Sequence, residues 1–374
     1  MKNKIVILYE EDKINPKDTW SGTSYQLREA LKEYYEVIFV DSYDVYIIEL
    51  FKKISKKIEK KTASFIIKPL YEKLHKVEIN KRLKKYRDIP VLEICENVIV
   101  KNDFYLYRDM SYMCYEYVLN KFKKDTNNYG HGMLRYISFD ALKQRIINEE
   151  TLVNKSKGTF IMGQWVVDLL NKQYPNNKEK YITVGGGLNN EFENFQINKT
   201  YKKKILFCGI DYLRKGGDLL ENAFCILKEK YDKDAELVIV GPEVDNHING
   251  VKYTGKIDKR ELSKYFNDCS VFCMPSRFEA YGLVFLEAQC YGLPIVTIDD
   301  YEMHYFVQDG VNGYLIKNYD AEELAKALHK ALNDKEMIRR VASNAKSFQE
   351  THTWDVVAEK ISNVINERSY KNEE

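Results

Sequence analysis

The residues best suited to chemistry in this sequence are two glutamates, Glu279 and Glu287, in the segment PSRFEAYGLVFLEAQCYGLP at residues 275–294. An apolar run that predicts a buried strand precedes this segment, and a helix-like run inside it ends at Gly292. A strand, a glycine turn and a helix start together favour an anion, because free backbone N–H groups and the helix dipole converge there. Two carboxylates beside that anion can bind sugar hydroxyls. The pattern therefore indicates a nucleotide-sugar site, and the alternative is that both glutamates only complement the helix dipole.

The segment resembles the Glu-x7-Glu motif of retaining glycosyltransferases with two Rossmann-like domains, the family 4 (group 1) enzymes. The flanking Pro-Ser and the closing Gly-Leu-Pro belong to the match. The resemblance implies that Glu279 contacts the transferred sugar and that Glu287 holds the nucleotide ribose. It also implies that the backbone amides of Gly282, Leu283 and Val284 meet sugar or phosphate, with Tyr281 in the same donor site.

A glycine-flanked basic pair, Arg214-Lys215, follows the strand-like run ILFC and Gly209. Two cations at a strand end are placed to neutralise a diphosphate leaving group. The stretch resembles the Gly…Lys-Gly segment of the family, which implies that Lys215 and Arg214 hold the phosphates and that Gly209 lies in the donor site. Many relatives have an arginine directly after the strand glycine, whereas this sequence has Ile210, so Arg214 is expected to compensate. The alternative is a basic pair in a surface turn.

Two further stretches are donor-site candidates through the same resemblance. YTGKI resembles the loop whose backbone meets the nucleobase, which implies donor contacts for Gly255, Lys256 and Ile257. WSGTS resembles the small-residue loop that closes over phosphate and acceptor, so Gly22 and Thr23 are phosphate-side candidates. By itself the latter stretch could simply cap a helix.

The catalytic end of the first domain departs most from the family pattern. Relatives often have a histidine after a mid-domain strand, where this sequence reads FYLYRDMS. Asp109 and Ser111 are expected to face the cleft, and Asp109 joins Glu279, Lys215 and Arg214 as a catalytic candidate. For His131 a loop or packing role is favoured over catalysis. The family's Gly-Gly-x-x-Glu loop is absent, and DDYEMHY at residues 299–305 predicts an unusually shaped sugar pocket.

The resemblance implies transfer of a hexosyl unit from a UDP- or GDP-sugar to a glycan, with retention of anomeric configuration. In that route the leaving phosphate itself accepts the proton of the acceptor. No metal or other cofactor is expected, because the architecture usually works without one and the sequence has no Asp-x-Asp motif suited to binding a metal. A dehydrogenase is disfavoured, since no G-x-G-x-x-G follows the first strand. An epimerase or phosphorylase on the same fold and a non-catalytic membrane-associated protein remain alternatives.

A strongly basic region lies in the first half of the chain. Residues 50–87 contain 14 basic and 3 acidic residues, and apolar residues recur at helical spacing at Ile47, Phe51, Ile54 and Ile58. Such a helix can lie on an anionic bilayer or contact a lipid-linked acceptor, so residues 47–87 are predicted to make peripheral membrane contact. The alternative is a solvated lysine-rich face whose apolar stripe packs on the domain. Nucleic acid is disfavoured, because no base-stacking platform accompanies the charge.

The 374-residue chain predicts two domains, and strand-like and helix-like segments alternate twice along it. Residues 89–100 and 104–107 are predicted as short strands, and residues 184–204 as the linker. The resemblance implies the α/β GT-B fold, in which two Rossmann-like domains face each other across a cleft. The acceptor-binding domain would span 1–190 and the nucleotide-sugar-binding domain 191–353, with a helix in 354–374 crossing back to the first domain.

Cellular placement is predicted from what the sequence contains near its start and in its apolar runs. No run approaches the roughly 18 residues of a membrane span, and the start MKNKIVILYEED turns acidic where a signal peptide would turn apolar. The protein is therefore predicted to be cytoplasmic, at the inner face of the plasma membrane if the basic region contacts lipid. The seven cysteines include no CxxC pair and are predicted to be buried, reduced thiols.

Overall fold

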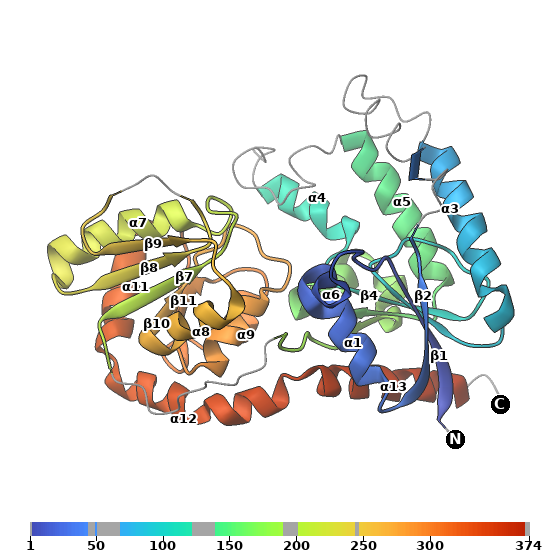
Figure 1. The fold of residues 1–374 in the computed structure, drawn as a ribbon. Helices are drawn as coiled ribbons and strands as arrows, with labels where there is room; N and C mark the ends of the chain where they lie inside the picture. Colours follow the sequence, from blue (N-terminus) through green and yellow to red (C-terminus); the bar gives the residue numbers. More distant parts are fainter. Residues whose placement is uncertain are drawn as a thin grey trace.

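A computed structural model describes residues 2–43, 49–50, 68–121, 139–189, 201–243 and 247–370. These residues form two α/β domains, each built on a six-stranded sheet in which every recorded strand pair is parallel (Figure 1). The alternation of strands and helices predicted from the sequence, and the two-domain GT-B architecture, are confirmed. Parallel sheets need helices on both faces to bury their side chains, which is the arrangement in both domains.

The first sheet has the strand order β2-β1-β3-β4-β5-β6. Its strands are β1 (Asn3–Tyr9), β2 (Tyr35–Asp41), β3 (Val91–Ile94), β4 (Phe104–Arg108), β5 (Gly158–Ile161) and β6 (Tyr181–Thr183). The 89–100 run forms a strand only at β3, and Cys95, with a φ of 58°, leaves the extended conformation directly after it. The predicted strand was therefore too long, because apolar content alone does not show where the backbone turns.

Alternate residues of β1 face different helices. Ile5, Ile7 and Tyr9 pack in one buried cluster, whereas Val6 and Leu8 belong to another. The period of two along a strand explains this division. The helices of this domain are α1 (Thr23–Leu31), α3 (Lys68–Leu83), α4 (Tyr112–Lys121), α5 (Phe139–Lys155) and α6 (Gln164–Gln173).

The second sheet has the strand order β12-β11-β10-β7-β8-β9. Its strands are β7 (Lys204–Cys208), β8 (Glu236–Val240), β9 (Val251–Gly255), β10 (Val271–Cys273), β11 (Ile295–Ile298) and β12 (Gly313–Ile316). Its helices are α7 (Gly217–Ile226), α8 (Lys259–Asp268), α9 (Leu283–Cys290), α10 (Met303–Phe306), α11 (Ala321–Asn333) and α12 (Lys335–Thr351). β7 and β10 lie next to each other at the middle of the sheet, so the loops that follow them meet at one edge.

The last helix, α13 (Trp354–Tyr370), crosses back to the first domain, as predicted (Figure 1). It packs beside α1, and its residues Val357, Ile361 and Ile365 share a buried cluster with Ile5 and Ile7 of β1. Farther along, the guanidinium of Arg368 donates to the backbone oxygen of Glu179 at 2.6 Å. The end of the chain therefore completes the core of the domain that its beginning builds.

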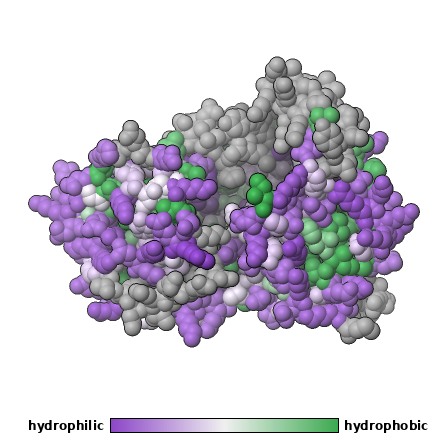
Figure 2. Space-filling view, in the orientation of Figure 1, coloured by the Kyte–Doolittle hydropathy of each residue, from purple (hydrophilic) through white to green (hydrophobic). Residues whose placement is uncertain are grey.

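The face of the molecule drawn in Figure 2 is mostly hydrophilic, and the largest hydrophobic group on it lies where Figure 1 places β2. None of the helices within the described residues has the length and apolar composition needed to cross a membrane. Residues 47–48 and 51–67 of the basic region predicted to contact a membrane lie outside the described residues, and so do Ile47, Phe51, Ile54 and Ile58 of its predicted apolar stripe; the described residues resume as a helix at Lys68.

None of the seven cysteines forms a disulfide, as predicted. Cys114, Cys269, Cys273 and Cys290 are buried, and Cys208 is half-buried. Cys95 and Cys225 are exposed, so the prediction that the thiols are buried holds for only part of the set.

Candidate active site between the two domains

A cavity of about 320 Å³ is lined by residues of both domains. The second domain contributes Arg214, Lys215, Glu279, Ala280, Tyr281, Gly282, Leu283, Val284 and Glu287, and the first contributes Trp20, Ser21, Thr23, Asp109, Met162 and Asn189. Most of the site residues predicted from the sequence therefore meet around one space. Gly22 adjoins this lining, whereas Gly209, Gly255, Lys256 and Ile257 do not line the cavity.

The strand β10, a loop and the start of α9 position the glutamate motif. Gly282 precedes α9 with a φ of 92°, and a Cβ there would lie 2.7 Å from a ring carbon of Phe285. Only glycine suits both the left-handed backbone and this close approach. The first N–H groups of a helix have no acceptor within it, so α9 presents Leu283 and Val284 to the cavity with its positive dipole end. The strand, glycine turn and helix start predicted from the sequence are therefore present, and anion binding at this helix end stays a prediction.

Glu279 is the centre of the polar contacts in the cavity, although only 8% of the residue is exposed. Its Oε2 accepts from the guanidinium of Arg214 at 3.2 Å, from Nζ of Lys215 at 3.3 Å and from Oγ of Ser276 at 3.3 Å. Burial alone would raise the pKa of this carboxyl, but the adjacent Lys215 and Arg214 outweigh it and lower the pKa below its usual value. Glu279 is therefore a carboxylate at neutral pH.

The two predicted phosphate-binding cations differ in their surroundings. Arg214 is 7% exposed, and besides Glu279 its guanidinium donates to Asp211 at 3.0 Å and to the backbone oxygen of Phe278 at 2.7 Å. Lys215 contacts Glu279 and lies 3.5 Å from the sulfur of Met274. The arginine thus positions the loop and the glutamate, and Lys215 is the better placed to reach a phosphate.

Gly209 does not line the cavity, but its lack of a side chain affects the position of Lys215. A Cβ at this position would lie 2.1 Å from Cδ of Lys215, so the missing side chain leaves room for the lysine stem. Ile210, which stands where many relatives have arginine, is 69% exposed. Arg214, which was expected to replace that arginine, does line the cavity. Its guanidinium N–H groups donate to Asp211, Phe278 and Glu279, so phosphate binding by Arg214 stays a prediction.

Asp109 follows β4 and lines the cavity, as expected from the sequence. Burial raises the pKa of Asp109 to about 6. The backbone N–H of Asp109 itself lowers the pKa, and the nearby charge of Glu279 raises it further. The expectation for Ser111 was wrong. Its hydroxyl is buried and donates to Oε2 of Glu149 at 2.9 Å, because the chain has turned into α4 and faces α5 instead of the cleft.

The loop before α1 is held in an uncommon conformation. The φ values are 48° for Trp20, 59° for Ser21 and 98° for Gly22. This left-handed conformation costs free energy at Trp20 and Ser21, because they are not glycine, so contacts with the surrounding structure must stabilise it. The side-chain amide of Asn189 donates to the backbone oxygen of Ser21 at 3.0 Å and lies 3.4 Å from Oγ1 of Thr23. Trp20, Ser21, Met162 and Asn189 line the cavity but were not predicted. Only the first two had a sequence signal, their position beside Gly22.

Hydrogen bonds between the domains fix the glutamate motif against the first domain. The indole N–H of Trp165 donates to the backbone oxygen of Ala280 at 2.7 Å, and its backbone N–H donates to Oε2 of Glu302 at 3.1 Å. The backbone N–H of Gly186 donates to the hydroxyl of Tyr281 at 3.1 Å. Tyr281 therefore joins the domains in addition to lining the cavity.

The unusual DDYEMHY tract takes part in the same interface. Glu302 of the second domain is buried against the N-terminal end of α6. Burial raises its pKa to about 7, although the backbone N–H groups of Trp165 and Gln164 lower it. The carboxylate of Asp300 pairs with Lys121 of the first domain, and the hydroxyl of Tyr305 pairs with Asp168. The departure from the family pattern thus supplies contacts between the domains.

Three expectations stay as predictions. The YTGKI segment ends β9 at the edge of the sheet, two strands from β7, and nothing in the cavity tests a nucleobase role for Gly255, Lys256 or Ile257. His131 lies outside the described residues. Among the residues that the structure describes, no group of three or more histidine, cysteine, aspartate or glutamate side chains is arranged to hold a metal ion.

Comparison with known proteins agrees with this geometry. Residues 189–348 match the family model of glycosyl transferases group 1. A phosphatidyl-myo-inositol mannosyltransferase of Mycobacterium leprae is 31% identical over 173 residues, which are 43% of this chain and 46% of that protein. A D-inositol 3-phosphate glycosyltransferase of Streptomyces griseus is 32% identical over 108 residues, 29% of this chain and 23% of that protein. The chain spans less than half the length of these two relatives.

Solved structures extend the likeness to the whole fold. WaaG, a glycosyltransferase involved in lipopolysaccharide biosynthesis, superposes with a TM-score of 0.62 at 16% identity, covering 97% of this chain and 99% of that one. HepE of Anabaena, solved in complex with UDP and glucose, has a TM-score of 0.61 at 12% identity and covers 97% of this chain and 99% of that one. At such low identity these structures define the fold alone.

Proposed function

We propose that this protein is a retaining glycosyltransferase that moves a hexosyl unit from a UDP- or GDP-sugar to a glycan acceptor, either lipid-linked or at the cell surface. The observation that carries the proposal is the contact of one buried carboxylate, Glu279, with Lys215 and Arg214 at the N-terminal end of α9. A carboxylate, a cation and a helix N-terminus around one cavity suit a sugar joined to a diphosphate.

In the proposed reaction the bond between the anomeric carbon and the diphosphate oxygen breaks. Negative charge builds on the diphosphate, where Lys215 and the first amides of α9 stabilise it. Positive charge builds on the sugar, and the carboxylate of Glu279 offsets it. Glu287 lies on α9 and lines the same cavity, where it would bind the ribose hydroxyls.

The acceptor hydroxyl would attack from the face that the diphosphate leaves. Its oxygen forms the new bond to the anomeric carbon, and its proton passes to an oxygen of the leaving phosphate, so no protein base and no metal is required. Asp109 lies on the first-domain side of the cavity, where it would orient the acceptor hydroxyl. This front-face route preserves the anomeric configuration.

The donor is tested first, by thermal shift against UDP-glucose, UDP-N-acetylglucosamine, GDP-mannose, ADP-glucose and dTDP-glucose. A donor at about 100 times its Kd should stabilise the protein by roughly 2.7 kcal/mol. Glu287→Ala should lose most of that shift, whereas Glu336→Ala, at an exposed glutamate of α12, should keep it. No response to any nucleotide sugar would defeat the proposal.

The reaction class is tested next with the responding donor. Release of UDP or GDP that needs a glycan acceptor supports transfer, and proton NMR of the product should report the anomeric configuration of the donor. Release of the nucleotide and free sugar epimer without an acceptor would indicate an epimerase. Dependence on inorganic phosphate would indicate a phosphorylase.

Peripheral membrane contact through residues 47–87 is part of the proposal and rests on the charge and apolar spacing of that region. The protein should sediment with vesicles rich in phosphatidylglycerol and not with phosphatidylcholine vesicles. Replacement of Lys52, Lys53, Lys56 and Lys57 by glutamine should release it, and retention of those variants on the vesicles would contradict the contact.

A further inference from the structure

The loop that carries Glu279 is held from both domains, although it belongs to the second. The backbone oxygen of Ala280 accepts from the indole N–H of Trp165, in the first domain, at 2.7 Å. On the other side of Glu279, the ring of Phe278 lies edge to face with the ring of Tyr301, with 5.4 Å between the ring centres. Both sequence neighbours of Glu279 are therefore fixed, and Ala280 is fixed by the first domain.

Trp165 is in turn fixed by the second domain. Its backbone N–H donates to Oε2 of Glu302 at 3.1 Å, and its ring centre lies 5.1 Å from that of Tyr301 in an edge-to-face contact. Trp165 and Glu302 are both buried. Breaking either hydrogen bond of Trp165 would therefore leave a buried polar group without its partner, which costs more than the loss of an exposed hydrogen bond.

The start of α6 leaves room for the carboxylate of Glu302. Gly163 precedes the helix and has no side chain that could cap the first N–H groups. The Oε2 atom of Glu302 takes the place of such a cap, from the other domain. A Cβ at Gly163 would lie 2.8 Å from that oxygen and 3.3 Å from the backbone oxygen of Ala280. A side chain here would therefore crowd both acceptors that the second domain presents to Trp165.

Tyr301, directly before Glu302, combines two unfavourable features. Its φ of 50° is left-handed, which is uncommon for a tyrosine, and its buried hydroxyl has no hydrogen-bond partner among the described residues. Both features cost free energy, and backbone strain of this kind occurs most often at functional sites. They accompany the packing of the Tyr301 ring against Trp165 and Phe278. The strained residue thus packs against both sides of the contact that holds the glutamate loop.

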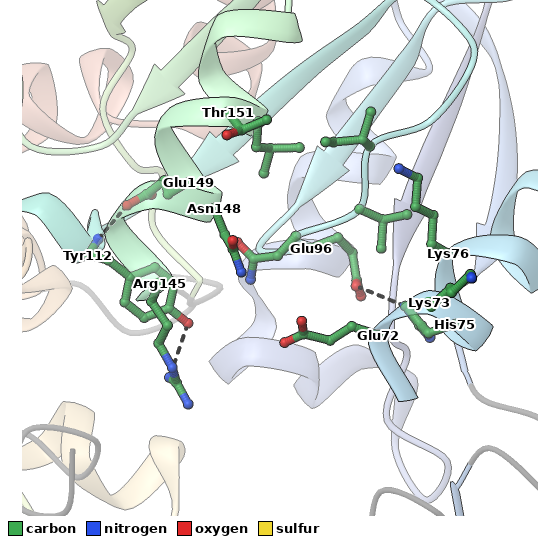
Figure 3. Close-up of a pocket in the computed structure, with 14 residues that line it drawn as sticks. Glu72, Lys73, His75, Lys76, Glu96, Tyr112, Arg145, Asn148, Glu149 and Thr151 are labelled. Atoms are coloured by element: carbon green, nitrogen blue, oxygen red, sulfur yellow. Dashed lines mark hydrogen bonds and ion pairs between the residues drawn. The ribbon is translucent and has the colours of Figure 1, made fainter. Parts of the chain in front are cut away.

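Asp109, across the cavity, is held within its own domain instead. Glu149 of α5 accepts from the guanidinium of Arg108 at 2.8 Å and from the backbone N–H of Tyr112 at 2.7 Å. Figure 3 shows the second of these contacts, between Glu149 and Tyr112. The chain on both sides of Asp109 is therefore fixed inside the first domain. Loss of the contact between the domains should move Glu279 and leave Asp109 in place.

We propose that Trp165 and Glu302 are positioning residues of the proposed reaction, which orient Glu279 toward the sugar without touching the donor. This inference rests on the proposed function, because it assigns the residues that hold the carboxylate of that reaction. Neither residue lines the cavity between the domains. When Lys215 turns to the diphosphate, the orientation of Glu279 depends more on the contacts of its own loop. The nucleotide, bound by Glu287, does not depend on them.

Steady-state kinetics of the full chain with the responding donor and its glycan acceptor test the positioning. Trp165→Phe keeps an aromatic ring but loses the N–H that donates to Ala280, and Glu302→Ala removes the acceptor at the start of α6. Each should lower kcat about ten- to hundredfold, because a misplacement of about 1 Å at the reacting centre has effects of that size. The Kd of UDP or GDP should change less than about twofold, because the contacts assigned to Glu287 remain. Wild-type kcat in both variants would overturn the inference.

Two further variants separate positioning from a general loss of packing. Glu302→Gln keeps an oxygen that accepts from the backbone N–H of Trp165, so it should retain most of the wild-type kcat. Tyr305→Phe is the matched control, because it removes the hydrogen bond to Asp168, which joins the same tract to α6 but does not reach Ala280. It should keep the wild-type kcat. A loss in Tyr305→Phe as large as that in Trp165→Phe would assign the effect to docking of the domains in general and would contradict the inference.

The contact can also be followed in the protein alone. The chain has three tryptophans, so a proton–nitrogen correlation spectrum should show three indole N–H signals, and Trp165→Phe identifies the signal of Trp165. That proton should exchange slowly with water in the wild type, because it is buried and hydrogen-bonded. Gly163→Ala, which crowds the contact from the first domain, should speed the exchange at least about tenfold and lower kcat as Trp165→Phe does. Fast exchange in the wild type, or an unchanged kcat in Gly163→Ala with fast exchange, would refute the assignment.

The inference and the proposed function fail in different measurements. A wild-type protein that responds to a nucleotide sugar, together with unchanged kcat in Trp165→Phe and Glu302→Ala, would leave the proposed function standing and remove the inference. No response of the wild type to any nucleotide sugar would remove the proposed function itself. Thermal melts without ligand check that each variant folds.

Discussion

The ammonium group of Lys215 lies 3.3 Å from Oε2 of Glu279, although the two residues come from loops that follow different strands, β7 and β10. Both side chains are largely buried, at 14% and 11% exposed. A lysine held this way is oriented toward the cavity by its partner, and the glutamate is kept ionised by the lysine. The pair therefore links the proposed stabilisation of the leaving group to the proposed contact with the sugar.

Lys215→Ala should abolish most of the turnover. Loss of a preorganised cation at the developing charge typically lowers kcat by about 10²- to 10³-fold. The measurement is kcat with the donor identified by thermal shift. Lys264→Ala, at an exposed lysine of α8, is the control and should keep wild-type kcat. A Lys215→Ala enzyme of normal kcat would exclude the lysine from the chemistry.

Asp109 should control the acidic side of the pH profile. Its pKa of about 6 means that the carboxylate is lost as the pH falls through 6, so kcat/KM should decline there. Asp109→Asn should be less active and should lack that decline. Stopped assays between pH 5 and 8 would show it, and an unchanged profile in the variant would assign the decline to another group.

Glu302 should make stability depend on pH. Its folded pKa of about 7 lies above its usual value of 4.5, so the folded protein binds more protons than the unfolded chain between those values. Stability should therefore fall as the pH rises from about 4.5 to 7, and the fall should end above 7.

Glu302→Gln should remove this part of the pH dependence, since the amide does not titrate and still accepts from the backbone N–H of Trp165. Urea unfolding of both proteins at pH 5, 6, 7 and 8 measures it. A wild-type curve that runs parallel to that of the variant would refute the assignment to Glu302.

Gly282→Ala should destabilise the folded protein. An alanine there combines a φ of 92° with a Cβ 2.7 Å from Phe285, and such strain costs on the order of 1–3 kcal/mol. Gly310→Ala is the matched control, because its φ of 71° is also left-handed but no atom lies within 4 Å of the added Cβ. The difference between the two melting temperatures isolates the steric contact. Equal losses would mean that backbone strain alone accounts for the effect.

The local parts of the site could be predicted because their signals are contiguous. A strand, a glycine in the left-handed conformation and a helix start occupy neighbouring positions around Glu279 and around Lys215, so residue types and spacing reveal them. Positions joined to the site only through space were missed. Asn189 meets Ser21 across 168 residues of chain, and no local pattern marks such a pair.

By itself the sequence determined the two series of parallel strands, the strand–glycine–helix units and the helix at Trp354–Tyr370, since these depend on apolar periodicity and turn residues. The tertiary structure decided which polar groups meet. It turned Ser111 away toward Glu149, placed Gly209 beneath Lys215 and made the DDYEMHY tract a contact between domains. The physical reason is that a hydrogen bond or ion pair depends on a few ångströms between residues distant in the chain, and only packing of the two sheets sets those distances.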